Sequence, residues 1–180
     1  MKISTKYILL LLVNLTFCSK IMDQTELRIS EIFPNLISSK WSMYKILTED
    51  SKSIQNTVRQ KFFRKEVNTW VITDSDSSKY YAVLDNIKGK SMPITFLAIF
   101  DSNKKVEDIT IIKYREAYGG EISNKKWLKQ FDAYTDSSNY SIGRKISAIS
   151  GATISVHSIS KGIRKLSMLI SNIIDDLNAK

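Results

Sequence analysis

Hydrophobic and polar positions alternate through the middle of the chain in short runs that are typical of β-strands. Branched and aromatic residues fill segments 69–73, 79–84, 94–100 and 109–114, and polar turns separate these segments. The turns are too short to contain crossover helices, so consecutive strands are expected to pair antiparallel. The pattern therefore predicts one antiparallel β-meander sheet.

Helical spacing of apolar residues is found on both sides of this central region. Residues 24–33 predict a short helix that ends near Pro34, and Asp50 and Ser51 form a candidate N-cap for a second helix. The apolar positions of that second helix are Ile54, Val58 and Phe62. A further short helix is predicted around the apolar residues Trp127, Leu128 and Phe131.

The last segment of the chain has the longest helical pattern. Its apolar stripe consists of Ile159, Ile163, Leu166, Ile170, Ile173 and Leu177. Lys161, Arg164 and Lys165 lie off this stripe. The expected fold class is therefore α+β: an antiparallel meander sheet flanked by helices, with a long C-terminal amphipathic helix.

Composition and the N-terminus define the domain organisation. The chain has 180 residues, of which 43% are hydrophobic and 25% charged, values that indicate a folded domain. Lys2 and Lys6 flank the start of a mostly apolar run over residues 7–17, which is short for a membrane span and typical of an export signal. We therefore expect a signal peptide over residues 1–20 and a single domain over residues 21–180.

Cys18 is the only cysteine in the sequence, which excludes an intramolecular disulfide. Its place at the end of the apolar run makes it a candidate for lipidation, although Phe17 stands where lipoproteins usually have a small residue. Ordinary signal cleavage and a retained N-terminal anchor remain alternatives. In each case the domain is expected outside the cytoplasm, in the periplasm or cell envelope.

The net charge of +9 indicates anionic partners. The cations are scattered along the chain, and an exported protein rarely meets nucleic acid, so we do not expect nucleic-acid binding. An anionic membrane surface, acidic redox partners or a phosphorylated cofactor fit this charge better.

No combination of side chains predicts a catalytic or metal site. His157 is the only histidine, so a site with several histidine ligands is excluded. Asp175 and Asp176 lie near the end of the predicted last helix, where a solvated face explains them. The sequence contains neither a GxGxxG motif nor a nucleophile elbow.

Two groups of small residues are the remaining candidates for a binding site. Ser150, Gly151, Ala152 and Thr153 precede the last helix, where open backbone N–H groups can bind an anion and a hydroxyl can carry a phosphate. An ordinary helix cap is the competing interpretation. Gly119 and Gly120 form the second group, and their backbone allows close approach of another group.

Three segments resemble the exported FMN-binding domain family: residues 114–122, 127–131 and 146–155. The family includes the peripheral flavin subunits of the sodium-pumping quinone reductase and of the Rnf electron-transport complex. Gly89 and Lys90 also resemble a family feature, and the similarity extends from about Phe33 to Leu169.

The resemblance implies that FMN is joined through its phosphate to Thr153, in the pattern Asp-x-x-Ser/Thr-Gly-Ala-Thr. It also implies that a separate Mg-dependent flavin transferase forms this bond from FAD. Ser147 stands at the Asp position of the pattern, so non-covalent FMN remains an alternative. The implied cofactor-binding residues are Thr153, Ser150, Gly151, Ala152, Glu116, Tyr118, Gly119, Gly120 and Glu121.

The function expected from these observations is an exported flavoprotein that carries electrons through FMN between membrane or envelope redox partners. Electron transfer requires no general acid or base, so an electron carrier is favoured over a stand-alone catalyst. The alternative is an envelope binding or interaction module of the same fold, with non-covalent FMN or with no flavin.

Overall fold

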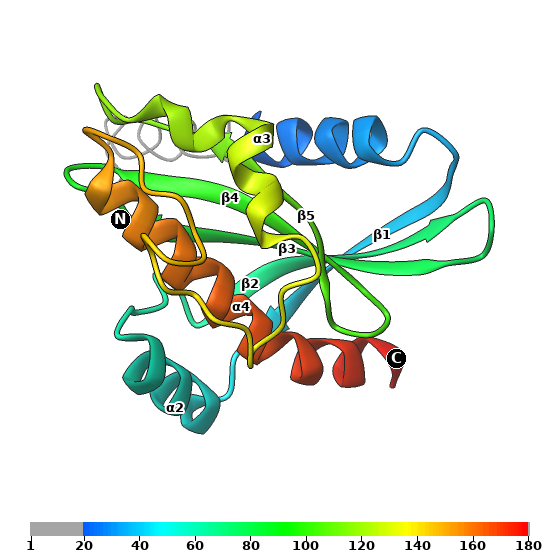
Figure 1. Ribbon diagram of the computed structural model, residues 1–180. Helices are drawn as coiled ribbons and strands as arrows, with labels where there is room; N and C mark the ends of the chain where they lie inside the picture. Colours follow the sequence, from blue (N-terminus) through cyan, green and yellow to red (C-terminus); the bar gives the residue numbers. More distant parts are fainter. Residues whose placement is uncertain (1–19, 180) are drawn as a thin grey trace, which may run out of the picture. The chain divides into compact units, whose positions relative to one another are not determined.

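The computed structural model describes residues 20–179 (Figure 1). The chain divides into two compact units, Met1–Pro34 and Asn35–Lys180. In the first unit, residues 20–32 form a helix, as the sequence predicts around residues 24–33. The predicted signal peptide and the lipidation candidate Cys18 lie outside the described residues, apart from Lys20. No helix within the described part of the chain is long and apolar enough to cross a membrane.

The second unit contains a five-stranded antiparallel sheet with the strands in sequence order, which confirms the predicted meander. The strands are β1 (Leu36–Lys45), β2 (Glu66–Asp74), β3 (Lys79–Lys88), β4 (Pro93–Asp101) and β5 (Val106–Lys113). The sequence analysis did not predict β1, because this edge strand is rich in serine and lysine and mostly exposed. It pairs with β2 in a register that places Tyr44 opposite Val67.

Five helical segments complete this unit: α2 (Thr48–Val58), η1 (Gly120–Ser123), α3 (Lys125–Leu128), η2 (Lys129–Phe131) and α4 (Thr153–Asn178). The N-cap predicted at Asp50–Ser51 is wrong, because α2 begins at Thr48 and Asp50 lies in its first turn. A carboxylate is favourable there because it faces the positive end of the helix dipole. Phe62 lies beyond α2, which ends where Arg59 adopts a left-handed conformation with φ of 53°.

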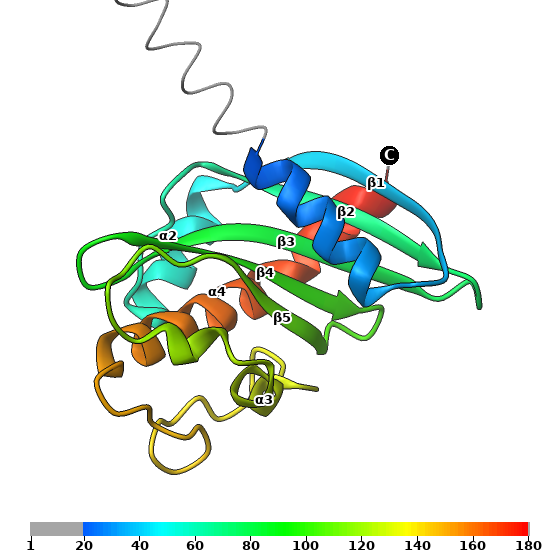
Figure 2. The same ribbon diagram turned by 90° about the horizontal axis from the view of Figure 1, so that it is seen from above.

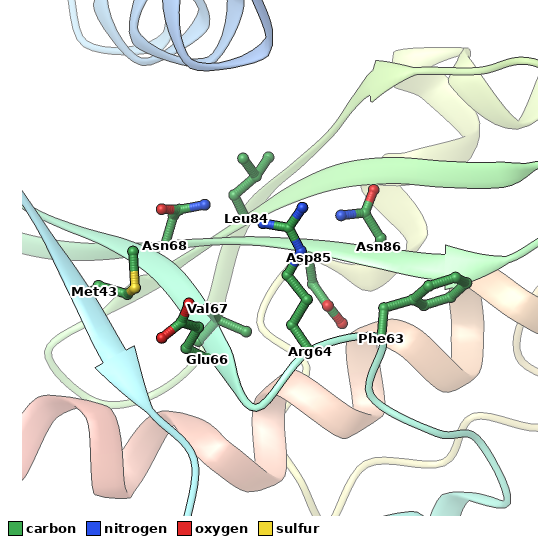
Figure 3. A pocket seen from close by; sticks show the side chains of 9 residues that line it. All are labelled: Met43, Phe63, Arg64, Glu66, Val67, Asn68, Leu84, Asp85 and Asn86. Atoms are coloured by element: carbon green, nitrogen blue, oxygen red, sulfur yellow. The ribbon is translucent and has the colours of Figure 1, made fainter. Parts of the chain in front are cut away.

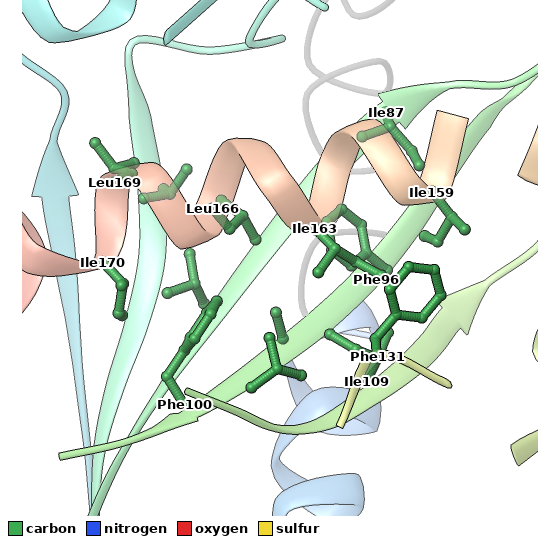
Figure 4. Close-up of a cluster of buried hydrophobic side chains, with 14 of the residues drawn as sticks. Ile87, Phe96, Phe100, Ile109, Phe131, Ile159, Ile163, Leu166, Leu169 and Ile170 are labelled. Carbon is green, nitrogen blue, oxygen red and sulfur yellow. The ribbon is translucent and has the colours of Figure 1, made fainter. Parts of the chain in front are cut away.

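Helix α4 packs along one face of the sheet and forms the core with it (Figure 4). The predicted stripe is buried, from Ile159 to Ile173, and faces aromatic side chains of β4 such as Phe96 and Phe100. Gly162 allows the close approach, since a Cβ atom there would lie 2.8 Å from Ile87 Cγ2. The long amphipathic C-terminal helix is therefore confirmed, and the sheet fixes where it begins.

Lys165 is buried, although the sequence pattern places it off the apolar stripe. Its Nζ lies 2.7 Å from Asp85 Oδ2 and 4.4 Å from the centre of the Phe62 ring, and it donates to the Lys61 carbonyl oxygen at 3.3 Å. A paired carboxylate makes a buried ammonium group tolerable. Lys165 thus links α4 to β3 and to the segment after α2. Asp85 also lines a hollow of about 50 Å³, which has room only for water (Figure 3).

The meander places several connections at one end of the sheet. The β3–β4 turn, the segment after β5 and the start of α4 lie at this end, and the β2–β3 and β4–β5 turns lie at the other (Figures 1 and 2). The two groups of small residues identified in the sequence, at residues 119–120 and 150–153, both lie at the first end.

Candidate functional site

The N-terminus of α4 is open. The first intrahelical hydrogen bond runs from Val156 N to Ala152 O at 2.9 Å, so the N–H groups of the three preceding residues have no partner within the helix. Ala152 is the N-cap residue and has no side chain that could cap them. Thr153 is exposed at the start of this 26-residue helix. Its hydroxyl and the positive end of the helix dipole are therefore available to an anion.

Gly151 shapes the turn that leads into α4. Its φ of 76° lies in the left-handed region, which favours glycine. A Cβ atom at Gly151 would meet no atom within 4 Å, so the space beside this backbone is free. Ser150 is exposed in the same turn. This geometry leaves room for a group bound against the first turn of α4.

The structure brings the glycine pair against this helix start. Gly119 has a φ of 84°, and a Cβ atom there would lie 2.9 Å from both Ala152 Cβ and Tyr114 Oη. Gly120 faces open space, since a Cβ atom on it would meet no atom within 4 Å. Gly119 is thus needed for the packing of the two segments, whereas Gly120 leaves space next to them.

Tyr114 connects the same two segments by hydrogen bonds. Its hydroxyl donates to the Tyr118 carbonyl oxygen at 2.5 Å and lies 3.1 Å from Ser155 Oγ in the first turn of α4. The sequence analysis did not include Tyr114 or Ser155 among the site residues. The side chain of Tyr118 is 84% exposed and lies free beside this contact.

Glu116 holds the β3–β4 turn. Its Oε1 accepts hydrogen bonds from Ser91 N at 2.8 Å and Met92 N at 3.1 Å, and these bonds lower the pKa of the carboxyl group. Gly89 lies so close that a Cβ atom there would overlap Glu116 Oε1. Glu116 therefore positions the turn that carries Lys90, and its predicted contact with a cofactor stays a prediction.

Glu121 and Ser147 line one hollow of about 410 Å³. The backbone of Ser147 is fixed from two sides: its N–H donates to Gln130 Oε1 at 2.7 Å, and its carbonyl oxygen accepts from Trp127 Nε1 at 2.9 Å. The position where the family pattern has Asp is therefore well ordered, and its exposed side chain lies near that of Glu121.

On the other side of the α4 N-terminus lies a cleft of about 750 Å³, which we call the basic cleft. It lies between the segment after α2, the β3–β4 turn and the first turns of α4, and is lined by Arg59, Gln60, Lys61, Phe62, Phe63, Lys88, Gly89, Lys90, Ile154, Ser158 and Lys161. Five of these residues are cations, and none of the described residues lining the cleft is acidic. The volume is that of a cofactor site.

Gln60 lies between this cleft and α4. Its Nε2 donates to the Ser158 carbonyl oxygen at 3.0 Å, while its Oε1 is buried without a hydrogen-bond partner among the described residues. An N–H or O–H group of a ligand, or a water molecule, can satisfy a buried acceptor of this kind. Sequence reasoning missed the cleft because its cations come from three distant segments; only Gly89 and Lys90 gave a signal.

No group of three or more histidine, cysteine, aspartate or glutamate side chains gathers in a metal-binding arrangement within residues 20–179. His157 is exposed on α4.

An open helix N-terminus, a glycine-rich contact and an adjacent cationic cleft define a domain that binds an anionic cofactor. Residues 89–167, from the β3–β4 turn to the middle of α4, match the model of the FMN-binding domain family, and the chain contains an FMN-binding domain of this family. FMN, a phosphate ester with a flat aromatic ring, is its cofactor, and both the cleft volume and the charge fit it. No curated protein matches the chain.

Proposed function

We propose that this protein is an exported flavoprotein that carries electrons between membrane or envelope redox partners through FMN attached to Thr153 by a phosphoester. The observation that carries the proposal is the exposed hydroxyl of Thr153 at the open N-terminus of α4, next to the free space at Gly151. Similarity to the flavin subunits of the sodium-pumping quinone reductase and the Rnf complex is part of this proposal.

The phosphate would be held by the first turn of α4. Backbone N–H groups there and the helix dipole would stabilise the negative charge of the phosphate, and Gly151 leaves space for it. In the attachment reaction, Thr153 Oγ bonds to the FMN phosphorus of FAD, the phosphoanhydride bond breaks, AMP leaves and the threonine proton is released. A flavin transferase is the partner that catalyses this step.

The basic cleft is the adjacent volume for the flavin ring. Phe62 offers apolar surface for a flat ring, and Gln60 Oε1 offers a buried acceptor. Bound FMN supplies reversible uptake and release of electrons. The cations of the cleft, among them Lys88 and Lys90, would stabilise negative charge on the ring by Coulomb attraction.

Non-covalent FMN is the second candidate, and Ser147 is the observation that favours it. An aspartate at this position would add a carboxylate to the hollow that Glu121 also lines, and serine does not supply that charge. The flavin would then be held only by the helix start and the basic cleft. Complete loss of flavin, leaving an interaction module, would be a further step in the same direction.

The test is coexpression with a flavin transferase, followed by denaturing electrophoresis and in-gel flavin fluorescence. We expect fluorescence in the wild type and none in Thr153→Ala, while Thr57→Ala, which removes an exposed hydroxyl on α2 outside the attachment motif, keeps it. Ser147→Asp is expected to increase the labelling. Equal signals from the wild type and Thr153→Ala would contradict covalent attachment, and yellow protein that loses its flavin on denaturation would support the second candidate.

A further inference from the structure

Large apolar side chains are exposed in four segments around the site, three of them connections and the fourth the first turn of α4. Phe63 is 51% exposed, Met92 46%, Tyr118 84% and Ile154 49%. Each belongs to a different segment: the one after α2, the β3–β4 turn, the one after β5, and the start of α4. Scattered exposed apolar residues are common on proteins, but apolar residues at several neighbouring loop tips mark an interaction surface.

Hydrogen bonds hold these four segments together. Glu116, after β5, accepts from Met92 N at 3.1 Å, and Tyr114 links the same segment to Ser155 of α4 at 3.1 Å. Gln60, after α2, donates to the Ser158 carbonyl oxygen at 3.0 Å. The four segments therefore meet at one end of the sheet (Figure 2), and we call their exposed side chains the loop surface.

The loop surface is rich in cations. Its exposed lysines and arginines are Arg59, Lys61, Arg64, Lys65, Lys88, Lys90 and Lys161. The acidic residues in or next to these segments are Glu66, Glu116 and Glu121, and Glu116 is already engaged by the β3–β4 turn. Cations therefore outnumber carboxylates on this surface.

The opposite end of the sheet carries much of the negative charge. Tyr80 lies there, and its pKa is raised by burial and then by the nearby carboxylates of Glu107, Asp76, Asp74 and Asp101. Among the described residues, Ile37 is the only large apolar residue exposed at this end. It follows Leu36, which pairs with Asp74 of β2. Lys79, Lys104 and Lys105 also lie at this end, so its charges are mixed, whereas cations dominate the loop surface.

We propose that the loop surface binds to an anionic lipid bilayer. Lysines attract the lipid phosphates, and Phe63, Met92, Tyr118 and Ile154 enter the interface between headgroups and acyl chains. An acidic protein partner would explain the cations alone, whereas exposed apolar side chains on four separate segments match a continuous apolar phase. Binding needs no flavin, so this proposal stands apart from attachment at Thr153.

The geometry gives the bilayer contact a consequence for the site. Ile154 follows Thr153 directly and lines the basic cleft, so a bilayer on the loop surface lies next to the cofactor site. A lipid-soluble electron carrier could then approach the cleft without leaving the membrane interface.

The experiment is co-sedimentation of the full-length protein with vesicles of equal parts phosphatidylglycerol and phosphatidylcholine, compared with phosphatidylcholine alone. Lys61→Gln/Lys88→Gln/Lys90→Gln should lower partitioning onto the anionic vesicles roughly 100-fold, since each lysine near such a surface contributes about fivefold. The matched control is Lys79→Gln/Lys104→Gln/Lys105→Gln, which removes the same charge at the opposite end and should have little effect.

A second pair of variants tests the apolar contact. Phe63→Ser should lower partitioning about tenfold, while Ile37→Ser, at the opposite end and 65% exposed, should leave it unchanged. Any contribution of residues 1–19 is common to all variants and cancels in the comparison. Equal losses from the two lysine triples, no preference for phosphatidylglycerol, or binding to polyglutamate but not to vesicles would each overturn the proposal.

Discussion

Replacing Gly119 by alanine tests how the glycine pair packs against the start of α4. The new Cβ atom would lie 2.9 Å from Ala152 Cβ and from Tyr114 Oη, closer than carbon atoms normally approach. A φ of 84° adds about 1 kcal/mol of strain for alanine, and overpacking at a rigid contact adds about 1–3 kcal/mol. We therefore expect Gly119→Ala to lower the free energy of unfolding by about 2–4 kcal/mol.

Two neighbouring glycines serve as graded controls in denaturant unfolding followed by circular dichroism. Gly151 has a φ of 76° but free space, so Gly151→Ala should cost only the strain, about 1 kcal/mol. Gly120 has neither a positive φ nor a close neighbour, so Gly120→Ala should change stability by less than about 0.5 kcal/mol. A loss at Gly120 as large as that at Gly119 would refute this account of the packing.

Three further predictions concern the supporting structure. Glu116→Gln should lower the free energy of unfolding at neutral pH. This difference from wild type should shrink as pH falls below the usual glutamate pKa, because the lowered pKa of Glu116 means that the group stabilises the fold only while it is charged. A pH series of unfolding curves checks this. Lys165→Met should lower the free energy of unfolding by about 3–5 kcal/mol because it leaves Asp85 unpaired, and adding Asp85→Asn should restore most of that loss. Equal stability of the single and double variants in denaturant would contradict the pairing. Gly162→Ala should lower the midpoint of thermal unfolding, because the new Cβ would lie 2.8 Å from Ile87 Cγ2. This effect should outweigh the better helix propensity of alanine. A raised midpoint would show that α4 can move away from the sheet.

Periodicity was sufficient to predict most of the fold. Strands β2–β5 are at least partly buried and rich in branched residues, so their pattern is strong. Strand β1, by contrast, is a polar edge strand that is stabilised by pairing with β2. Lys165 shows a second limit. Its burial depends on Asp85, a residue 80 positions away (165 minus 85), and no local pattern reveals such a partner.

The candidate site was partly predictable for a similar reason. Small residues before a helix give a local signal, and in the structure Gly119 packs against Ala152 at the start of α4. The basic cleft combines cations from three segments, so it becomes visible only once the meander is folded. Glu116 illustrates the reverse case: a residue selected for its place in a motif is found holding a turn.

The most direct test of the central claim is peptide-resolved mass spectrometry of the protein isolated from the cells that produce it. The account predicts that the peptide containing Thr153 carries the added mass of one FMN phosphoester and that fragmentation assigns this mass to Thr153. An unmodified Thr153 peptide, in a protein that also fails to bind added FMN, would contradict it.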